Sequence, residues 1–351
     1  MFESIRVRNL RAVSELVVQN LGRINLFVGQ NNCGKTTLLE ALFFLIGATN
    51  PKLPINANIF RGLGFLRSEW WDTFFHNLDS KSHIVVSGMV SGTGEERELV
   101  IQPIIENVMT TESVSPDMVS VNLNGGDSKS ASMTYGLELL YTSSLDPTHK
   151  TESRVVLKND QLLTEGTKES SIRGVFVGPS TRFDWKPRFS SIQRKKKINE
   201  LISSLKEIDP TIIDIRLNDV GVLEVDMGLP SLVPVNLLGG GMANFLSVAL
   251  AMLDTSDGIV LIDEIENGLH YSVLNKLWQG VFSWSNESNV QVFATTHSNE
   301  CIRAFSNTVE ASLFEPQARL FRIERKDEDF RAVEYSRENL AQSLDSSWEV
   351  R

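Results

Sequence analysis

The most informative stretch of this 351-residue sequence is Gly29-Gln30-Asn31-Asn32-Cys33-Gly34-Lys35-Thr36. An apolar run at residues 24–28 precedes it, and a second apolar run, Leu38 to Ile46, follows it. The order strand, glycine loop and helix is the setting in which the pattern G-x-x-x-x-G-K-[ST] forms a phosphate-binding loop. A plain glycine turn is the alternative, and the two apolar runs favour the phosphate-binding loop.

This loop offers several kinds of contact to a nucleotide. Gly29 and Gly34 allow successive backbone N–H groups to curl around a phosphate, and the N-terminus of the following helix adds partial positive charge. We expect the Lys35 ammonium to reach the β- and γ-phosphates of ATP, and the Thr36 hydroxyl to be a ligand of Mg²⁺. The predicted binding residues are Gly29, Asn31, Asn32, Cys33, Gly34, Lys35, Thr36 and Thr37.

Composition narrows the class of protein. The net charge of −10 gives no overall attraction to nucleic acid, so any DNA contact needs a local basic patch. The two cysteines, Cys33 and Cys301, are expected to be free thiols in a reducing cytoplasm. The first residues carry no apolar signal region, and no apolar run reaches the ~18 residues of a membrane span. The sequence therefore predicts a soluble, cytoplasmic protein with no membrane contact.

Hydrophobic patterning predicts an α/β fold with a mostly parallel central sheet, because apolar strands alternate with helices along the chain. Residues 173–179 are expected to be a central strand of that sheet. The aromatic side chains of residues 65–78 are expected to pack in the core, and an exposed partner surface is the alternative. Strands are predicted at residues 4–10, 24–28, 173–179, 258–262 and 290–295, and helices at 35–47, 65–78, 190–207, 242–253, 271–284 and 337–346.

Other segments predict an antiparallel β part. Residues 82–103 and 152–164 contain β-branched runs divided by Gly and Asn-Asp turns, which indicate hairpins. Further hairpins are expected at residues 211–226 and 319–335. Residues 106–131 are rich in Ser, Asn, Gly and Met, and we expect a mobile insertion there.

A second motif, Ile259-Val260-Leu261-Ile262-Asp263-Glu264, is the acidic strand that a phosphate-binding loop needs. Its four apolar residues predict a buried strand whose end brings two carboxylates near the phosphates. We expect Asp263 to hold Mg²⁺, mostly through water, and Glu264 to polarise the attacking water. Solvated acids at a strand end are the alternative, which the upstream loop makes less favoured.

Two further segments are candidates for the same site. His297 follows the buried strand of residues 290–295 at the carboxyl edge of the sheet, where ligands of open α/β sheets bind. It could contact the γ-phosphate or the attacking water. Gly239, Gly240 and Gly241 precede a helix and can form a second nest of N–H groups for an anion. A structural histidine and a plain loop are the respective alternatives.

A basic segment is interleaved with Phe183, Trp185 and Phe189, and such a patch could bind the phosphate backbone of DNA. The charged face of a surface helix is the alternative, and we favour it. The cations of this segment are Arg182, Lys186, Arg188, Arg194, Lys195, Lys196 and Lys197.

Together, these motifs resemble the ATP-binding-cassette ATPase heads of the SMC and RecF type. They are still more similar to the ATPase domain of the OLD class and its relatives in bacterial defence systems. Asn9-Leu10-Arg11 resembles the N-F-R near the start of those proteins. Residues 263–270 look like their D-E-x-E-x-x-L-H, and residues 295–298 match their T-T-H-S. The resemblance is weak only over residues 50–170.

The resemblance implies a P-loop NTPase head of the ABC type, with an antiparallel β subdomain and a helical lobe, as a single unit over residues 1–351. A nucleotide-binding, β-rich lobe would span residues 1–185, with a variable insertion at 50–170. A helical lobe carrying the glycine signature would span residues 186–257. Residues 258–351 would carry the acidic strand, the switch histidine and a C-terminal hairpin.

The resemblance also implies roles for single residues. Glu264 would activate water, His297 would sense the γ-phosphate, and Thr36 with Asp263 would hold Mg²⁺. Two heads would pair head-to-tail around two ATP molecules, with residues 239–241 of each chain facing the γ-phosphate held by the other. Residues 266–270 would touch the partner head.

Some positions depart from the family pattern. Gly239 stands where the transporter-type signature has Ser, so a hydroxyl contact is lost while the backbone donors remain. The glutamine that usually lies between the phosphate loop and the signature has only two candidates, Gln161 and Gln193. Only about fifty residues follow His297, too few for the TOPRIM nuclease domain that follows OLD ATPases, so we expect no nuclease domain here.

Three functions are weighed on these grounds. The first is an ATPase, producing ADP and phosphate, that forms a homodimer or higher homo-oligomer around ATP. It would control a separately encoded effector or nuclease, with defence against phage suggested by the resemblance. The second is a DNA-binding repair ATPase of the RecF kind. The third, a P-loop kinase or GTPase, is disfavoured: the Asn-Lys-x-Asp of GTPases is absent, and the glycine signature with the switch histidine argues against a kinase.

Overall fold

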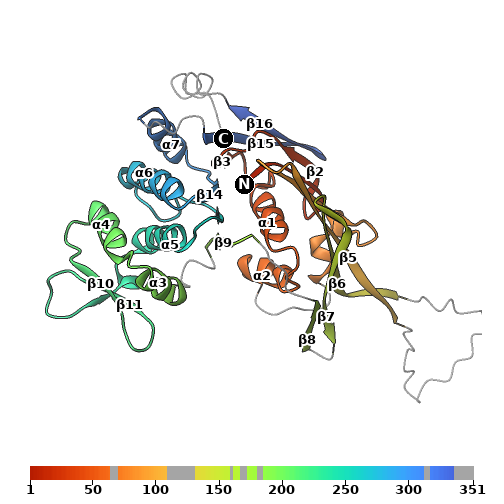
Figure 1. Cartoon of the computed structure of the whole chain (residues 1–351), viewed down its shortest axis with the longest axis horizontal. Coiled ribbons are helices and arrows are strands. Elements are labelled where there is room, and N and C mark those ends of the chain that lie inside the picture. The colour runs from red at the N-terminus through yellow and green to blue at the C-terminus, as the bar shows by residue number, and fades with distance from the viewer. Residues whose placement is uncertain are drawn as a thin grey trace, which may run out of the picture.

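The computed structural model describes residues 1–63, 70–108, 131–158, 161–166, 172–179, 185–311 and 317–335. Within these ranges the strands form a seven-stranded sheet, a six-stranded sheet and a three-stranded sheet. Figure 1 shows a mainly helical side and a β-rich side, which meet at the six-stranded sheet.

The six-stranded sheet is assembled from segments far apart in the chain, in the order β16-β15-β3-β14-β13-β9. All neighbouring pairs are parallel except β15 and β16, which form the predicted C-terminal hairpin. This confirms the mostly parallel sheet expected from the alternation of strands and helices. Its strands are β3 (Ile24–Val28), β9 (Gly174–Val177), β13 (Ile259–Ile262), β14 (Gln291–Thr295), β15 (Ala318–Lys326) and β16 (Asp329–Tyr335).

Helices cover both faces of this sheet, so its middle strands are apolar on both sides. Side chains alternate between two cores: Phe27, Leu261 and Phe293 belong to one, and Val260 and Val292 to the other. The helices that contribute to the first core include α1 (Lys35–Ile46), and those that contribute to the second include α5 (Gly240–Asp254), α6 (Tyr271–Glu287) and α7 (Asn299–Ala311).

One strand lies elsewhere than predicted. Residues 173–179 do contain a strand, β9, but its expected central position is wrong, because within the described residues β9 pairs with β13 alone and forms an edge of the sheet. Phe176 and Val177 are nevertheless buried, since α1 and α5 pack on its two faces. An edge strand covered by helices therefore has the apolar composition of a central one.

The seven-stranded sheet is antiparallel, in the order β2-β1-β4-β5-β6-β7-β8, and contains the hairpins predicted at residues 82–103 and 152–164. The predicted insertion at 106–131 falls mostly on residues 109–130, outside the described residues. The strands are β1 (Phe2–Leu10), β2 (Val13–Val18), β4 (Ile84–Val90), β5 (Glu95–Val108), β6 (Ala131–Ser143), β7 (Asp146–Lys158) and β8 (Gln161–Gly166).

Two helix predictions are wrong in detail. The helix expected at residues 190–207 is two helices, α3 (Trp185–Arg194) and α4 (Ile198–Ile208), because Lys196 adopts a positive φ of 59° between them. The aromatic segment 70–78 forms only two short 3₁₀ turns, η2 (Asp72–Phe74) and η3 (His76–Leu78), while residues 64–69 lie outside the described residues. Its aromatic side chains are buried as expected: Trp71, Phe74 and Phe75 are all at most 1% exposed.

Two further predictions and the remaining elements concern the rest of the chain. The hairpin expected at residues 211–226 is confirmed, and the helix expected at 337–346 lies outside the described residues. Within the described residues, no helix is long and apolar enough to cross a membrane. The further elements are α2 (Leu53–Phe60), β10 (Asp214–Leu217), β11 (Leu223–Asp226), β12 (Val233–Pro234) and the 3₁₀ turn η4 (Val235–Leu237).

Candidate functional site

The glycine loop connects β3 to α1, and its backbone needs glycine at two points. Gly29 has φ 142° and Gly34 has φ 98°, conformations that residues with a Cβ rarely adopt. A Cβ on Gly29 would also lie 2.4 Å from the carbonyl oxygen of Ile323. The loop therefore turns tightly before α1, whose N-terminus faces the space where a phosphate would lie.

Lys35 folds back over this loop. Its Nζ donates hydrogen bonds to the carbonyl oxygens of Gly29 and Gln30, both at 2.8 Å, and lies 3.4 Å from Nδ1 of His297. The side chain is only 5% exposed, and burial lowers the pKa of its ammonium below the ordinary value. The predicted phosphate-loop lysine and the predicted switch histidine thus lie against each other.

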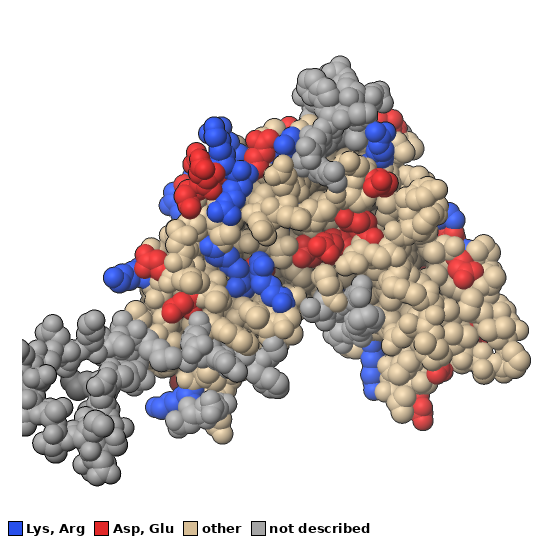
Figure 2. All heavy atoms as spheres, turned by 180° about the vertical axis from the view of Figure 1, so that it is seen from behind, with Lys and Arg blue, Asp and Glu red and all other residues tan. Residues whose placement is uncertain are grey.

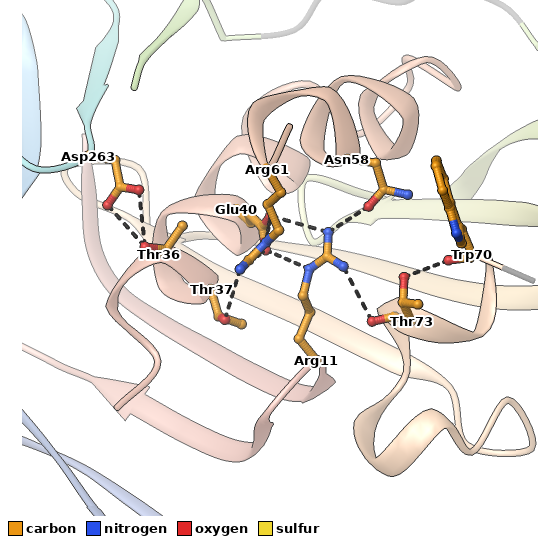
Figure 3. Close-up of polar contacts among 9 residues, drawn as sticks. All are labelled: Arg11, Thr36, Thr37, Glu40, Asn58, Arg61, Trp70, Thr73 and Asp263. Carbon is orange, nitrogen blue, oxygen red and sulfur yellow. Dashed lines mark hydrogen bonds and ion pairs between the residues drawn. The ribbon is translucent and has the colours of Figure 1, made fainter. Parts of the chain in front are cut away.

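Asp263 lies at the end of β13, beside the start of α1. Both of its carboxylate oxygens are 3.1 Å from the Thr36 hydroxyl (Figure 3). The Thr295 hydroxyl donates a further hydrogen bond to Asp263 at 2.7 Å. Burial raises the pKa of Asp263, and the neighbouring Glu264 charge adds to that effect. A hydroxyl and a carboxylate in contact are the hard oxygen ligands that Mg²⁺ takes together with phosphate and water, so these two residues fit the ion.

Glu264 and His297 follow two neighbouring parallel strands, β13 and β14. Glu264 has a positive φ of 52°, and its N–H donates to the Thr295 hydroxyl at 2.9 Å, so the chain turns sharply after the strand. Its carboxylate accepts a hydrogen bond from Asn267 at 3.2 Å. Burial, together with the Lys35 charge, lowers the pKa of His297, which keeps the ring neutral at pH 7.

These residues share a pocket of ≈530 Å³. It is lined by Asn31, Asn32, Gly34, Lys35, Thr36, Thr37, Glu264 and His297, and also by Arg11, Ala12, Arg61 and Arg325. Cations thus outnumber acids around the pocket, which suits a polyphosphate. The structure brings together the two motifs that are more than 200 positions apart in the sequence.

Three of the lining cations, Arg11, Arg61 and Arg325, were not assigned to the site by the sequence analysis. The first two converge on Glu40 of α1, which is 1% exposed (Figure 3). Arg11 donates to its carboxylate at 2.9 and 3.3 Å, and Arg61 at 2.7 and 2.9 Å. Burial alone would raise the pKa of Glu40, but the two guanidinium groups outweigh it and hold that pKa below its ordinary value. An acid inside an otherwise apolar helix was the signal that could have revealed this network.

The glycine signature lies outside this pocket. Gly239 precedes α5 with φ 94°, and both Gly239 and Gly240 are exposed. A Cβ on either would meet no described atom within 4 Å. Gly241 differs, because a Cβ there would lie 2.4 Å from the carbonyl oxygen of Gly268. The glutamine candidates, Gln161 and Gln193, are exposed and do not line the pocket either.

The basic segment is partly used within the fold. Trp185 and Phe189 are at most 5% exposed and belong to the core, so these aromatic side chains cannot stack on bases. Lys195 forms an ion pair with Asp254, and Lys197 donates to the Ser288 hydroxyl. Arg182 and Phe183 lie outside the described residues. On the face seen in Figure 2, the described Lys and Arg side chains gather in small groups with acidic groups beside them.

The chain has a P-loop NTPase-like α/β fold, with a pocket beside the glycine loop. Among solved structures, the fold is similar to that described as "Crystal structure of the SmcHead bound to the C-winged helix domain of ScpA". The two share a TM-score of 0.54 and 11% identity, over 97% of this chain and 99% of that chain.

The family can be stated more narrowly. Residues 24–303 match the family described as "AAA domain, putative AbiEii toxin, Type IV TA system", and the chain belongs to this family of AAA ATPase domains. The chain is also similar to the protein named "ATP/GTP phosphatase" of Helicobacter pylori, with 23% identity over 377 residues and 97% of each chain covered. The protein is therefore an enzyme of the ATPase class.

Proposed function

We propose that the chain is an ATP-operated switch: ATP pairs two chains head-to-tail, and hydrolysis separates them. The observation that carries the proposal is the convergence of Lys35, the Thr36–Asp263 pair, Glu264 and His297 on one pocket. Together these residues provide a cation for the phosphates, two ligands for Mg²⁺, a carboxylate that activates water and a side chain that contacts the γ-phosphate.

Each of these groups has a defined task in the proposed reaction. Glu264 accepts the proton of the attacking water on its carboxylate, while Lys35 neutralises charge that develops on the γ-phosphate. Thr36 and Asp263 would hold Mg²⁺, which would supply positive charge to the phosphates of the nucleotide. Because an ammonium only donates, Nδ1 of His297 accepts from Lys35, and the neutral ring carries its proton on Nε2 as a donor for the phosphate.

The exposed glycine signature supports the pairing of two chains. Gly239 and Gly240 present backbone N–H groups at the start of a 15-residue helix, outside the pocket of their own chain. Such a helix start favours an anion. We propose that this anion is the γ-phosphate held by a second chain, as the resemblance to ATP-binding-cassette heads implies.

We further propose that the switch controls a separately encoded effector or nuclease in defence against phage. The support is the resemblance of residues 263–270 and 295–298 to OLD-class ATPases of defence systems. Deletion of the neighbouring gene should abolish protection, while this chain stays intact. Full protection by this chain alone would contradict the proposal.

The pairing is tested by measuring mass in solution. Glu264→Gln keeps the shape of the side chain but removes the base, so the ATP-bound state should accumulate. With ATP and Mg²⁺ the variant should shift from monomer to dimer, and it should stay monomeric with ADP. Lys35→Ala in the same background is the matched control, since it should not respond to ATP. If the Glu264→Gln variant binds ATP yet remains monomeric, the proposed pairing of two chains is wrong.

A DNA-binding head of the RecF kind is the alternative. The exposed cations Lys186, Arg194 and Lys196 support it, while the buried Trp185 and Phe189 do not. Filter binding across salt concentrations separates the two proposals, because phosphate contacts weaken steeply with salt. The alternative would be supported if the wild type retains DNA on the filter at low salt and a variant with Ala at these three cations does not.

A further inference from the structure

The loop after the acidic strand, residues 265–269, lies between the pocket and the glycine signature; we call it the bridge loop. On the signature side, Asn244 of α5 donates from Nδ2 to the Ile265 carbonyl oxygen at 2.9 Å. The backbones of Gly241 and Gly268 are so close that a Cβ on Gly241 would lie 2.4 Å from the Gly268 carbonyl oxygen. The bridge loop is therefore fastened to the N-terminal part of α5.

On the pocket side, Glu266 fastens the bridge loop to the switch histidine. Its Oε1 accepts a hydrogen bond from the backbone N–H of His297 at 2.9 Å. Next to it, the Ile265 N–H donates to the carbonyl oxygen of Thr295 at 3.0 Å. The carboxylate of one half-buried glutamate thus fixes the backbone at His297, just after β14.

The second carboxylate oxygen of Glu266 makes this residue unusual. Oε2 is buried and has no hydrogen-bond partner among the described residues. A buried acceptor without a donor lowers stability, and such groups in folded proteins call for an explanation other than stability. A glutamate that served packing alone would be better replaced by an apolar or fully paired side chain.

We propose that Glu266 is a positioning residue for ATP hydrolysis. It holds the backbone of His297 so that the imidazole faces the γ-phosphate, and through the bridge loop it links that position to the glycine signature. A second chain that docks on Gly239 and Gly240 would shift the bridge loop as well. Docking would therefore be coupled to the position of His297. This inference rests on the proposed role of His297.

A double-mutant cycle in steady-state ATP hydrolysis tests the proposal. Glu266→Ala should lower kcat by about tenfold with KM for ATP within about twofold, because it displaces a group that acts in the transition state. The Glu266→Ala/His297→Ala double variant should be no slower than His297→Ala alone, since Glu266 acts through His297. Losses that multiply in the double variant would overturn the proposal.

Conservative variants separate positioning from a merely structural role. Glu266→Gln retains an oxygen that can accept from the His297 N–H, so its kcat should stay within about threefold of the wild type. Glu300→Ala is the matched control: Glu300 contacts the Ser298 hydroxyl in the same segment, and its loss should leave kcat unchanged. If Glu266→Ala does not fold, Glu266→Asp replaces it, and it should be slow where Glu266→Gln is not.

The outcomes distinguish this inference from the proposed function. Turnover that is unaffected by His297→Ala would overturn the role of His297, and this inference with it. Turnover that depends on His297 but is equal in Glu266→Ala and the wild type would overturn the positioning role alone. A Glu266→Gln variant as slow as Glu266→Ala would also contradict it, because the accepting oxygen would then not suffice.

Discussion

The starts of α1 and α5 use the same local device with different surroundings. Both helices begin after a glycine with positive φ, at Gly34 and Gly239, and both present backbone N–H groups at the helix end. Around α1, side chains converge on that end, with the buried Lys35 and the half-buried Thr36–Asp263 pair among them. Around α5, a Cβ on Gly239 or Gly240 would meet no described atom within 4 Å.

On the proposed function, this difference would make the start of α1 a complete anion site and the start of α5 half of one. Lys35, Arg11 and Arg61 give the first site charge and enclosure, which strengthen electrostatic contacts by excluding water. The second site offers only backbone dipoles in contact with solvent, where each contact is weak. A second surface would have to close it, so the two helix starts are expected to respond differently to mutation. The predictions below run from the largest effect on the isolated chain to the smallest.

The buried acid beneath the first site should matter most for stability. Glu40→Ala leaves the guanidinium groups of Arg11 and Arg61 without their shared partner, and should lower the free energy of unfolding by about 3–5 kcal/mol. Chemical denaturation at pH 7 measures this change. Asp214→Ala is the control: it breaks the exposed ion pair with Arg216 and should leave the denaturation midpoint nearly unchanged.

The same variant carries a pH dependence. Because the folded pKa of Glu40 lies below its ordinary value of 4.5, its stabilisation is fully present above pH 4.5 and is lost as pH falls through the folded pKa. The difference between the wild type and Glu40→Ala should therefore shrink below pH 4.5. A difference that grows on acidification would mean that the carboxyl is not held ionised by the two arginines.

Loss of the lysine should disable the first site while leaving the fold intact. Lys35→Ala removes a buried cation from the phosphate cradle, and ATP should bind about a hundredfold more weakly, a loss of about 2.7 kcal/mol. Titration calorimetry with ATP and Mg²⁺ measures the affinity. Equal ATP affinity in this variant and the wild type would show that the cradle is not the nucleotide site.

The histidine should affect turnover more than binding. His297→Ala should reduce kcat by about ten- to a hundredfold, since one positioned donor to the γ-phosphate is lost. Phosphate release under saturating ATP measures it. In the wild type, the pKa of His297 lies below the ordinary histidine value of 6.5, so the ring becomes charged only below pH 6.5. Lowering the pH from 8 to 7 should therefore not change the contribution of His297 to kcat. In His297→Ala, a rise in KM with constant kcat would mean that His297 contributes to ATP binding and not to the reaction.

Mutation at the start of α5 should have no effect on the isolated chain. Gly240→Asp places a carboxylate where there is room, and an acid in the first turn of a helix is favourable, so folding and ATP affinity should be unchanged. The negative charge should instead repel a γ-phosphate offered by another chain, and ATP-dependent pairing should be lost. Sedimentation of Gly240→Asp in the Glu264→Gln background measures this. Normal pairing would assign the glycine signature to another role.

Local patterns predicted most elements because they rest on properties of neighbouring residues. The glycine loop and the strand of residues 259–262 were found from apolar runs and turn residues. The break at Lys196 escaped prediction, because the apolar spacing continues across it and a lysine gives no signal of positive φ. The place of β9 also escaped, since burial by helices on both faces imitates the composition of a central strand.

The residues around the pocket could be predicted where they lie within a motif, and were hidden where their position depends on three-dimensional packing. Lys35 and Glu264 could be named from the sequence, and both line one pocket. Arg61 could not, because it follows α2 in a region without a motif and reaches Glu40 only through tertiary packing. The contact of Glu266 with the His297 backbone was equally invisible, since sequence patterns do not report side chain to backbone hydrogen bonds across strands.

The order of strands in the parallel sheet has a consequence for biosynthesis. The strand that feeds the glycine loop lies between two neighbours that are translated far later, and the N–H of Phe2 bonds to the side chain of Gln291, 289 positions onward. Loops of that length slow folding, because chain entropy is lost before any contact repays it. A nascent polypeptide on the ribosome therefore cannot build a competent ATPase until β14 and β15 have emerged, which keeps shorter nascent chains from consuming ATP.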